Sequence, residues 1–181
     1  MILNMLISNF NKKILLLFYL VILSGNACAA EYLDKVNDKI KFPTFNVLDG
    51  NENPLMLKFN QDFKKKGYII NFWATWCVPC KQELPDLSLL KSKIKKYNID
   101  VLTISIDKKN IKDQLEFLSN NGASNLNHLF DKEMKIFKAL KLRGVPTTII
   151  VDQNSYVISK HEGILEWGED EIINKIKSLF N

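Results

Sequence analysis

The stretch Trp76-Cys77-Val78-Pro79-Cys80 carries more information about this chain than any other part of its sequence. Residues 68–73, directly before it, are apolar and partly aromatic, which predicts a buried strand. After it, the apolar residues Leu87, Leu90 and Ile94 follow a helical spacing. A strand, a sharp turn and a helix beginning with Cys-x-x-Cys are the context in which this motif indicates redox chemistry. Two thiols so placed can exchange two electrons by closing and opening one disulfide.

The composition is that of a globular protein with a substantial core. The chain has 181 residues, of which 46% are hydrophobic and 25% are charged, and this size and composition predict one folded domain. The formal net charge is +5, and two of the lysines, Lys12 and Lys13, lie in an N-terminal segment without acidic residues. The remainder is only slightly basic, so we predict no nucleic-acid partner.

Residues 1–30 have the pattern of an export signal. Lys12 and Lys13 precede an apolar run over residues 14–23, and Ala27-Cys28-Ala29-Ala30 follows as a site of the Ala-x-Ala type. The apolar run is shorter than the ~20 residues that span a bilayer comfortably. We therefore predict a signal peptide over residues 1–30, with an uncleaved membrane anchor as the alternative. Cys28 is interpreted as a small residue of the cleavage region rather than a lipid-modified one.

Cysteine usage favours a catalytic pair over a structural one. If the leader is cleaved after either of its last two alanines, Cys77 and Cys80 are the only cysteines left. A disulfide that closes so short a loop constrains the unfolded chain little, so a purely structural staple is disfavoured. A zinc site would need two further ligands, and His128 and His161 lack any paired spacing. We therefore predict redox catalysis without a metal or a cofactor.

The pattern along the chain predicts an α/β fold with a mixed sheet. Two short alternating segments, 43–48 and 55–59, flank a turn-rich stretch and predict a β-hairpin. Residues 31–41 predict a short helix or an irregular lead-in, and residues 64–67 predict the end of a short helical turn. The later elements are predicted as strand 68–73, a helix to about residue 97, strand 99–107, a helix capped by Asn110 that ends near residue 121, a short strand at 129–130, a short helix over 134–140, a hairpin of 147–151 and 156–158, and a helix over 169–180.

Two strings make the chain resemble the TlpA/ResA-like thiol–disulfide oxidoreductases of the thioredoxin superfamily, which bacteria export. They are residues 71–85, Asn-Phe-Trp-Ala-Thr-Trp-Cys-Val-Pro-Cys-Lys-Gln-Glu-Leu-Pro, and residues 144–148, Gly-Val-Pro-Thr-Thr. The resemblance implies a thioredoxin-like domain over residues 40–181: a mixed central β-sheet flanked by helices, with an N-terminal β-hairpin and a central insertion. It also implies a periplasmic location, with residues 12–30 as the inner-membrane anchor if they are retained. A further implication is that Pro146 is cis and lies beside the thiols.

The two cysteines are expected to form a redox-active disulfide and to act in sequence. Cys77 lies at a helix N-terminus, which favours the thiolate, so it is the expected nucleophile. Cys80 is expected to attack the resulting mixed disulfide and release the partner. Trp76 is expected to shield the thiol and contact partners. A cis Pro146 would present the backbone of Val145 for pairing with an extended partner segment.

Glu83 lies one turn beyond Cys80 on the same helix face, and two interpretations stay open. One is an ordinary solvated glutamate. The other, suggested by the resemblance, is a group that moves the proton of Cys80 or raises the pKa of the thiols by like-charge repulsion. Asn71 stands where cytosolic thioredoxins have a buried aspartate. Because Asn cannot act as a base, any proton relay must use Glu83 or water.

The resemblance implies an exported reductant that opens disulfides in client proteins. Its clients would be apocytochrome c or copper-site proteins of cytochrome oxidase assembly, and its electrons would come from a membrane thiol transporter. One alternative is an exported oxidant, because potentials in this fold range from about −270 to about −120 mV. Another is a non-catalytic copper-binding or docking module that uses the two thiols as soft ligands. Copper would also need a His or Met ligand, and none lies near the pair in sequence.

Overall fold

The structure, a computed structural model, describes residues 33–180 with gaps at residue 39 and residues 60–64. The leader predicted for residues 1–30, including the alternatives of cleavage and anchoring, lies outside the described residues. The helical turn predicted to end at residues 64–67 lies partly outside them; its described residues are not helical, and Gly67 begins a strand instead. Among the described residues, no helix combines the length and apolar character needed to cross a membrane.

One mixed sheet organises the described part of the chain. Its eight strands run in the order β1-β8-β7-β4-β5-β6-β2-β3. Strands β4, β5 and β6 are mutually parallel, whereas β7 pairs antiparallel with β4, and β8 pairs antiparallel with β7. The strand bounds are β1 Asp34–Lys35, β2 Asn46–Leu48, β3 Pro54–Met56, β4 Gly67–Trp73, β5 Ile99–Ser105, β6 Asn127–Phe130, β7 Thr147–Asp152 and β8 Val157–Glu162.

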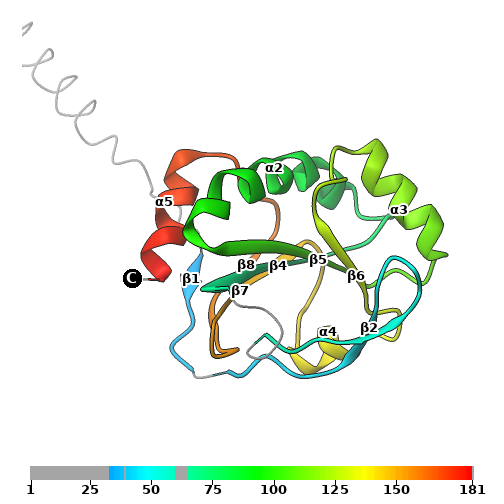
Figure 1. Cartoon of the computed structure of the whole chain (residues 1–181), viewed down its shortest axis with the longest axis horizontal. Helices are drawn as coiled ribbons and strands as arrows, with labels where there is room; N and C mark the ends of the chain where they lie inside the picture. Colours follow the sequence, from blue (N-terminus) through cyan, green and yellow to red (C-terminus); the bar gives the residue numbers. More distant parts are fainter. Residues whose placement is uncertain (1–32, 39, 60–64, 181) are drawn as a thin grey trace, which may run out of the picture. The chain divides into compact units, whose positions relative to one another are not determined.

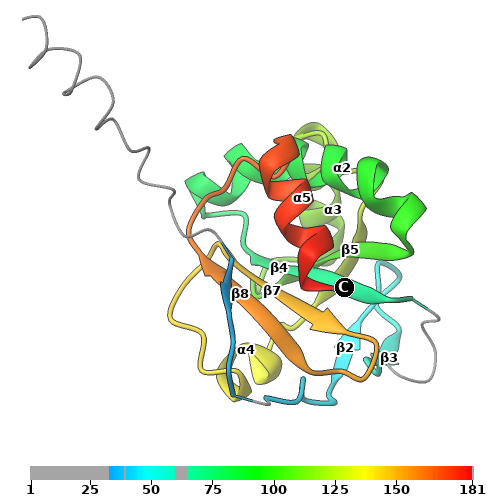
Figure 2. The same ribbon diagram turned by 90° about the vertical axis from the view of Figure 1, so that its left-hand side faces the viewer.

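Helices cover both faces of this sheet. Helix α2 (Val78–Ile94), α3 (Ile111–Asn120) and α5 (Asp170–Leu179) lie on one face, and the short α4 (Lys135–Ala139) lies on the other (Figures 1 and 2). A 3-10 turn, Lys95–Tyr97, follows α2 directly. The predicted α/β architecture, a mixed central sheet flanked by helices, is therefore confirmed.

Most of the predicted elements are present. The first hairpin forms from β2 and β3, and the second forms from β7 and β8. Asn110 caps α3 as predicted, because its Oδ1 atom accepts a hydrogen bond from the backbone N–H of Lys112 at 2.8 Å. The option of a helix within residues 31–41 is wrong at Asp34–Lys35, which form β1 and pair with β8. An edge strand offers unpaired backbone groups, and this pairing outweighs the weak local helical pattern.

The central strand β4 determines where the site lies. All seven of its residues are buried between β5 and β7, as the apolar pattern predicted. Its carboxyl end leads into the Cys-x-x-Cys motif. Because β7 is antiparallel to β4, Thr147 pairs with Phe72 near that end. Pro146, directly before Thr147, therefore lies at the same sheet edge as the motif, where open α/β sheets commonly place their ligands.

Candidate active site

The two cysteines form a disulfide across the first turn of α2. Their Cα atoms are 5.3 Å apart. Cys77 is the N-cap residue, and its Sγ atom accepts a hydrogen bond from the backbone N–H of Cys80 at 3.2 Å. The helix N-terminus favours a thiolate at Cys77, because its free N–H groups and dipole stabilise negative charge. Cys77 is 4% exposed and Cys80 is fully buried, which is the order of accessibility expected from the sequence.

Large apolar side chains flank Cys77 at the surface. Trp76 is 64% exposed and Val78 is 68% exposed. Trp73, three residues earlier, is instead fully buried and stacks on Phe117 with ring centroids 5.8 Å apart. The buried strand predicted over residues 68–73 is therefore confirmed at Trp73, its last residue. Trp76 is available at the surface to contact another protein.

The Val145–Pro146 peptide bond is cis, as the resemblance implied. Two hydrogen bonds hold the chain around it: the Gly163 N–H donates to the Pro146 carbonyl at 2.9 Å, and the Thr147 hydroxyl donates to the Gly144 carbonyl at 2.7 Å. Among the described residues, neither the N–H nor the carbonyl of Val145 has a hydrogen-bond partner. The backbone of Val145 is therefore free to pair with an incoming segment.

Glu83 is buried beneath this surface. Only 1% of it is exposed, so the interpretation as a solvated glutamate is wrong. Its Oε1 atom accepts a hydrogen bond from Asn71 Nδ2 at 2.7 Å, and its Oε2 atom accepts one from Trp167 Nε1 at 3.0 Å. Burial raises the pKa of Glu83 to about 7, although the hydrogen bonds from Trp167 and Asn71 act to lower it. This carboxyl can gain or lose a proton near neutral pH.

The polar groups around Glu83 come from three separate segments. Asn71 lies on β4 and donates a second hydrogen bond to Thr148 Oγ1, on β7, at 2.9 Å. Trp167 lies in the loop between β8 and α5 and is fully buried. Sequence reasoning had identified Asn71 and Glu83 but had missed Thr148 and Trp167. The one available signal for Trp167 is a large aromatic residue in the short segment before the last helix.

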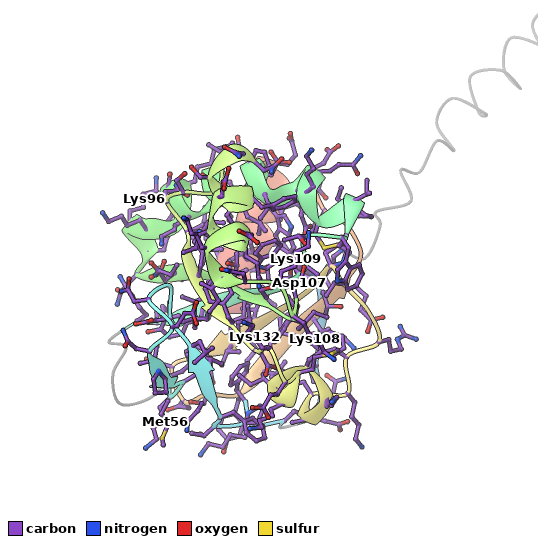
Figure 3. All side chains as sticks on the ribbon, turned by 90° about the vertical axis from the view of Figure 1, so that its right-hand side faces the viewer. Met56, Lys96, Asp107, Lys108, Lys109 and Lys132 are labelled. Carbon is purple, nitrogen blue, oxygen red and sulfur yellow. A yellow bond between two sulfur atoms is a disulfide. The ribbon has the colours of Figure 1, made fainter. Side chains whose placement is uncertain are left out.

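A second buried carboxylate lies on the other side of the motif. Asp107 follows β5 and is 5% exposed. Its Oδ2 atom accepts two hydrogen bonds from Thr75, one from the backbone N–H at 3.0 Å and one from the hydroxyl. Its Oδ1 atom accepts a hydrogen bond from the Lys109 N–H at 3.0 Å. Burial acts to raise the pKa of Asp107, but these hydrogen bonds outweigh it and the pKa is lowered. Figure 3 shows Asp107 with Lys108 and Lys109 on this side of the molecule. Asp107 thereby fixes Thr75, two residues before Cys77.

Neighbouring groups hold the rings of both histidines. In the part of the chain that the structure describes, no group of three or more His, Cys, Asp or Glu side chains could hold an ion. The ring of His128 lies between the Thr103 hydroxyl and the Ala123 carbonyl, and burial lowers its pKa to about 4. His161 contacts the Trp167 ring edge-on, with ring centroids 6.2 Å apart. The surroundings of both histidines therefore indicate a role in packing and hydrogen bonding within the fold.

A disulfide at a helix N-terminus, a cis-proline at the same sheet edge and this sheet order define a thioredoxin-like thiol–disulfide oxidoreductase. The family model named Redoxin matches residues 35–176, and the chain belongs to that family. It is 29% identical over 156 residues to the thiol-disulfide oxidoreductase ResA of Bacillus thuringiensis, covering 83% of this chain and 87% of ResA.

Solved structures agree with this assignment. A thiol:disulfide interchange protein DsbE from Chlorobium tepidum is 25% identical and superposes with a TM-score of 0.68, covering 82% of this chain and 99% of that one. The exposed lipoprotein thioredoxin Etrx1 from Streptococcus pneumoniae is 23% identical, with a TM-score of 0.62, covering 75% of this chain and 99% of that one; this likeness shows the fold. The protein is thus a thiol–disulfide oxidoreductase of the ResA/DsbE type with one Cys-x-x-Cys pair.

Proposed function

We propose that this enzyme is an exported reductase that opens disulfides in thiol-containing client proteins. The observation that carries this direction is the buried carboxyl of Glu83, one helical turn beyond Cys80. A negative charge there disfavours the thiolates, and a reduced form that is not stabilised makes the dithiol the stronger reductant. No cation contacts Glu83 among the described residues: its contacts are the neutral donors Asn71, Trp167 and the Leu165 backbone.

The reaction proceeds through two exchanges of sulfur bonds. The Cys77 thiolate attacks one sulfur of the client disulfide, which forms a mixed disulfide and releases the first client thiolate. The Glu83 carboxylate takes the proton of Cys80, whose thiolate then attacks the Cys77 sulfur. This step closes the Cys77–Cys80 disulfide and releases the second client thiolate. Two electrons have passed to the client, and a membrane thiol transporter supplies two further electrons that reduce the Cys77–Cys80 disulfide again.

The surface around the disulfide receives the client. Trp76 contacts the partner next to Cys77. The unpaired backbone of Val145, presented by the cis Pro146, forms hydrogen bonds with an extended segment of the client. Such pairing recognises the backbone of the client rather than its side chains. It therefore suits clients whose disulfide lies in a flexible segment. Apocytochrome c and copper-site proteins of cytochrome oxidase assembly are the clients that we propose.

Trapping experiments test the roles of the cysteines. A Cys80→Ser variant should accumulate a mixed disulfide between Cys77 and an oxidised peptide carrying a haem-attachment or copper-site cysteine pair, visible as a mass increase that dithiothreitol removes. A Cys77→Ser variant should form no such adduct. If Cys77→Ser formed the adduct and Cys80→Ser did not, the order of attack would be reversed.

The direction of the reaction is tested by the reduction potential. Equilibration with defined thiol buffers should give a value near about −270 mV, at the reducing end of this fold. A value near about −120 mV, typical of a strong oxidant, would contradict the reductase proposal and support the oxidant alternative. Glu83→Gln, which removes the negative charge, should make the potential less reducing.

Export is part of the proposal and has its own test. The basic, apolar and Ala-x-Ala segments of residues 1–30 support a signal peptide ahead of a thioredoxin-like domain over residues 40–181. Expression of the full chain in a Gram-negative host should place the protein in the periplasm. N-terminal sequencing then distinguishes cleavage near residue 30 from retention of residues 12–30 as a membrane tether. Recovery of the intact chain from the cytoplasm would contradict export.

A further inference from the structure

We propose that Trp167 is a positioning residue of the redox site, and that its indole N–H holds the Glu83 carboxyl in the orientation needed for proton transfer. The proposal rests on the function proposed above, in which Glu83 takes the proton of Cys80. Trp167 lies 84 positions from Glu83 in the sequence and donates to its Oε2 atom at 3.0 Å. In this role Trp167 acts on the reaction through Glu83.

The Glu83 carboxyl is held by a donor on each oxygen. Asn71 Nδ2 donates to Oε1 from the sheet, and Trp167 Nε1 donates to Oε2 from the loop before α5. Both donors are fully buried. Rotation of the carboxyl would leave a buried N–H without an acceptor, which is costly in the protein interior. The carboxyl is therefore held in one orientation by groups on two different elements.

The loop that carries Trp167 is itself anchored on both sides of the site. At its start, the Gly163 N–H donates to the Pro146 carbonyl at 2.9 Å, which joins the loop to the cis-proline segment. At its end, the Gly168 carbonyl accepts a hydrogen bond from Lys93 Nζ, on α2, at 2.8 Å. One short loop thus connects the proposed client-binding backbone with the proposed proton acceptor.

The chemistry of the indole suits this position. An indole N–H is an uncharged donor, so it orients a carboxylate without the strong pKa depression that a lysine or arginine would cause. Asp86, on the same helix, acts through its charge to raise the pKa of Glu83, and His161 of β8 contacts the Trp167 ring. Trp167 therefore contributes alignment while Glu83 remains able to titrate near neutral pH.

The test replaces the N–H and keeps the ring. In Trp167→Phe, Glu83 loses the strongest of the hydrogen bonds that lower its pKa, so its titration midpoint should move upward by about one pH unit, a tenfold change in the proton equilibrium. The midpoint is measured in the oxidised protein by 13C NMR of glutamate-labelled chain, where the cysteines do not titrate. The pH profile of peptide-disulfide reduction should shift in the same direction.

Trp73→Phe is the matched control. Trp73 is equally buried, but in the described part of the chain its Nε1 atom has no hydrogen-bond partner. This variant should lose ring volume without moving the Glu83 midpoint. Should Trp167→Phe fold poorly, benzothienylalanine at position 167 keeps the tryptophan shape with sulfur in place of the N–H and should reproduce the shift.

Two outcomes separate this inference from the proposed function. If Glu83→Gln leaves the pH profile of disulfide reduction unchanged, the proton-transfer role of Glu83 is wrong, and Trp167 has no carboxyl to position. If Glu83→Gln changes the profile but Trp167→Phe leaves both the profile and the Glu83 midpoint as in the wild type, only the inference about Trp167 is overturned. In the Glu83→Gln background, Trp167→Phe should cause no further shift.

Discussion

Glu83 and Asp107 are two buried carboxyls on either side of the same motif, and their proton affinities are shifted in opposite directions. Glu83 accepts hydrogen bonds from an amide and an indole, and its pKa rises to about 7. Asp107 accepts from two backbone N–H groups and a hydroxyl, with the charge of Lys109 nearby, and its pKa is lowered. Burial alone would raise both pKa values.

The difference shows that the balance between the cost of burial and the hydrogen bonds decides what each carboxyl can do. The three donors of Asp107 favour the ionised form, so Asp107 holds the chain before Cys77 as an anion at neutral pH. At Glu83 the cost of burial is the largest contribution, and the hydrogen bonds from Trp167, Asn71 and the Leu165 backbone only partly offset it. Glu83 therefore remains close to the pH at which it can accept and return a proton, which is the property a general base needs.

The largest effect is expected in the pH dependence of stability. The folded-state pKa of Glu83 is raised from 4.5 to about 7, so between these values the folded protein binds a proton that the unfolded chain has lost. The contribution of Glu83 to the free energy of unfolding is fully present below about pH 4.5. It is lost as the pH rises through about 7, a change of about 3 kcal/mol. Urea unfolding of the wild type and Glu83→Gln should show their difference in unfolding free energy moving in favour of the variant as pH rises.

Comparing the two proteins cancels an opposing contribution. The folded-state pKa of His128 is lowered to about 4, so its contribution to stability grows with rising pH over a range that overlaps that of Glu83. The histidine is present in both proteins and drops out of their difference. A difference that stays constant with pH would show that Glu83 ionises as an ordinary surface glutamate does.

Asp107→Asn should have the next largest effect, with the opposite dependence on pH. An asparagine cannot accept all three hydrogen bonds, so one buried donor loses its partner and the free energy of unfolding at pH 7 should fall by about 2 kcal/mol. Because the folded-state pKa of Asp107 is lowered, its stabilisation is present above about pH 4, the unfolded-state pKa, and is lost on further acidification. Asp113→Asn, at an exposed position in α3, is the control and should change stability little.

Thr75→Val tests one of the three hydrogen bonds that Asp107 accepts. The valine keeps the backbone N–H of residue 75 and removes the hydroxyl that donates to Oδ2. Thermal and urea unfolding should show a loss of about 1 kcal/mol, the usual net contribution of one hydrogen bond. Thr44→Val, at an exposed position, gives the reference for the same substitution. A loss equal to that of Asp107→Asn would mean that the backbone donors contribute nothing.

The smallest effect is expected for Lys109→Met. The exposed Lys109 side chain lowers the pKa of Asp107 through its charge, whereas the Lys109 N–H, which the variant keeps, does so through a hydrogen bond. Loss of the charge should cost only a few tenths of a kcal/mol, and moderate salt should reduce the effect further. Lys108→Met is the matched control. A loss as large as that of Asp107→Asn would show that charge, rather than hydrogen bonding, keeps Asp107 ionised.

Local patterns predicted the elements whose information lies within a few residues. The continuous apolar run predicted β4, the helical spacing after Cys80 predicted α2, and Asn110 marked the start of α3. The strand β1 was missed because it exists only through pairing with β8, which comes more than a hundred positions later in the chain. Nothing within residues 31–41 encodes that partner.

The sequence by itself determined the chemistry of the site. It places two thiols at the start of a helix after a buried strand, and its resemblance to a known family implied that Pro146 is cis. Only the tertiary structure decided the burial and the pKa of the Glu83 carboxyl. Its two side-chain donors lie 12 positions before it and 84 positions after it in the chain. The pKa of a buried acid depends on what surrounds it in space. No local pattern around Glu83 specifies an indole from the loop before α5, so its environment appears only once the chain has folded.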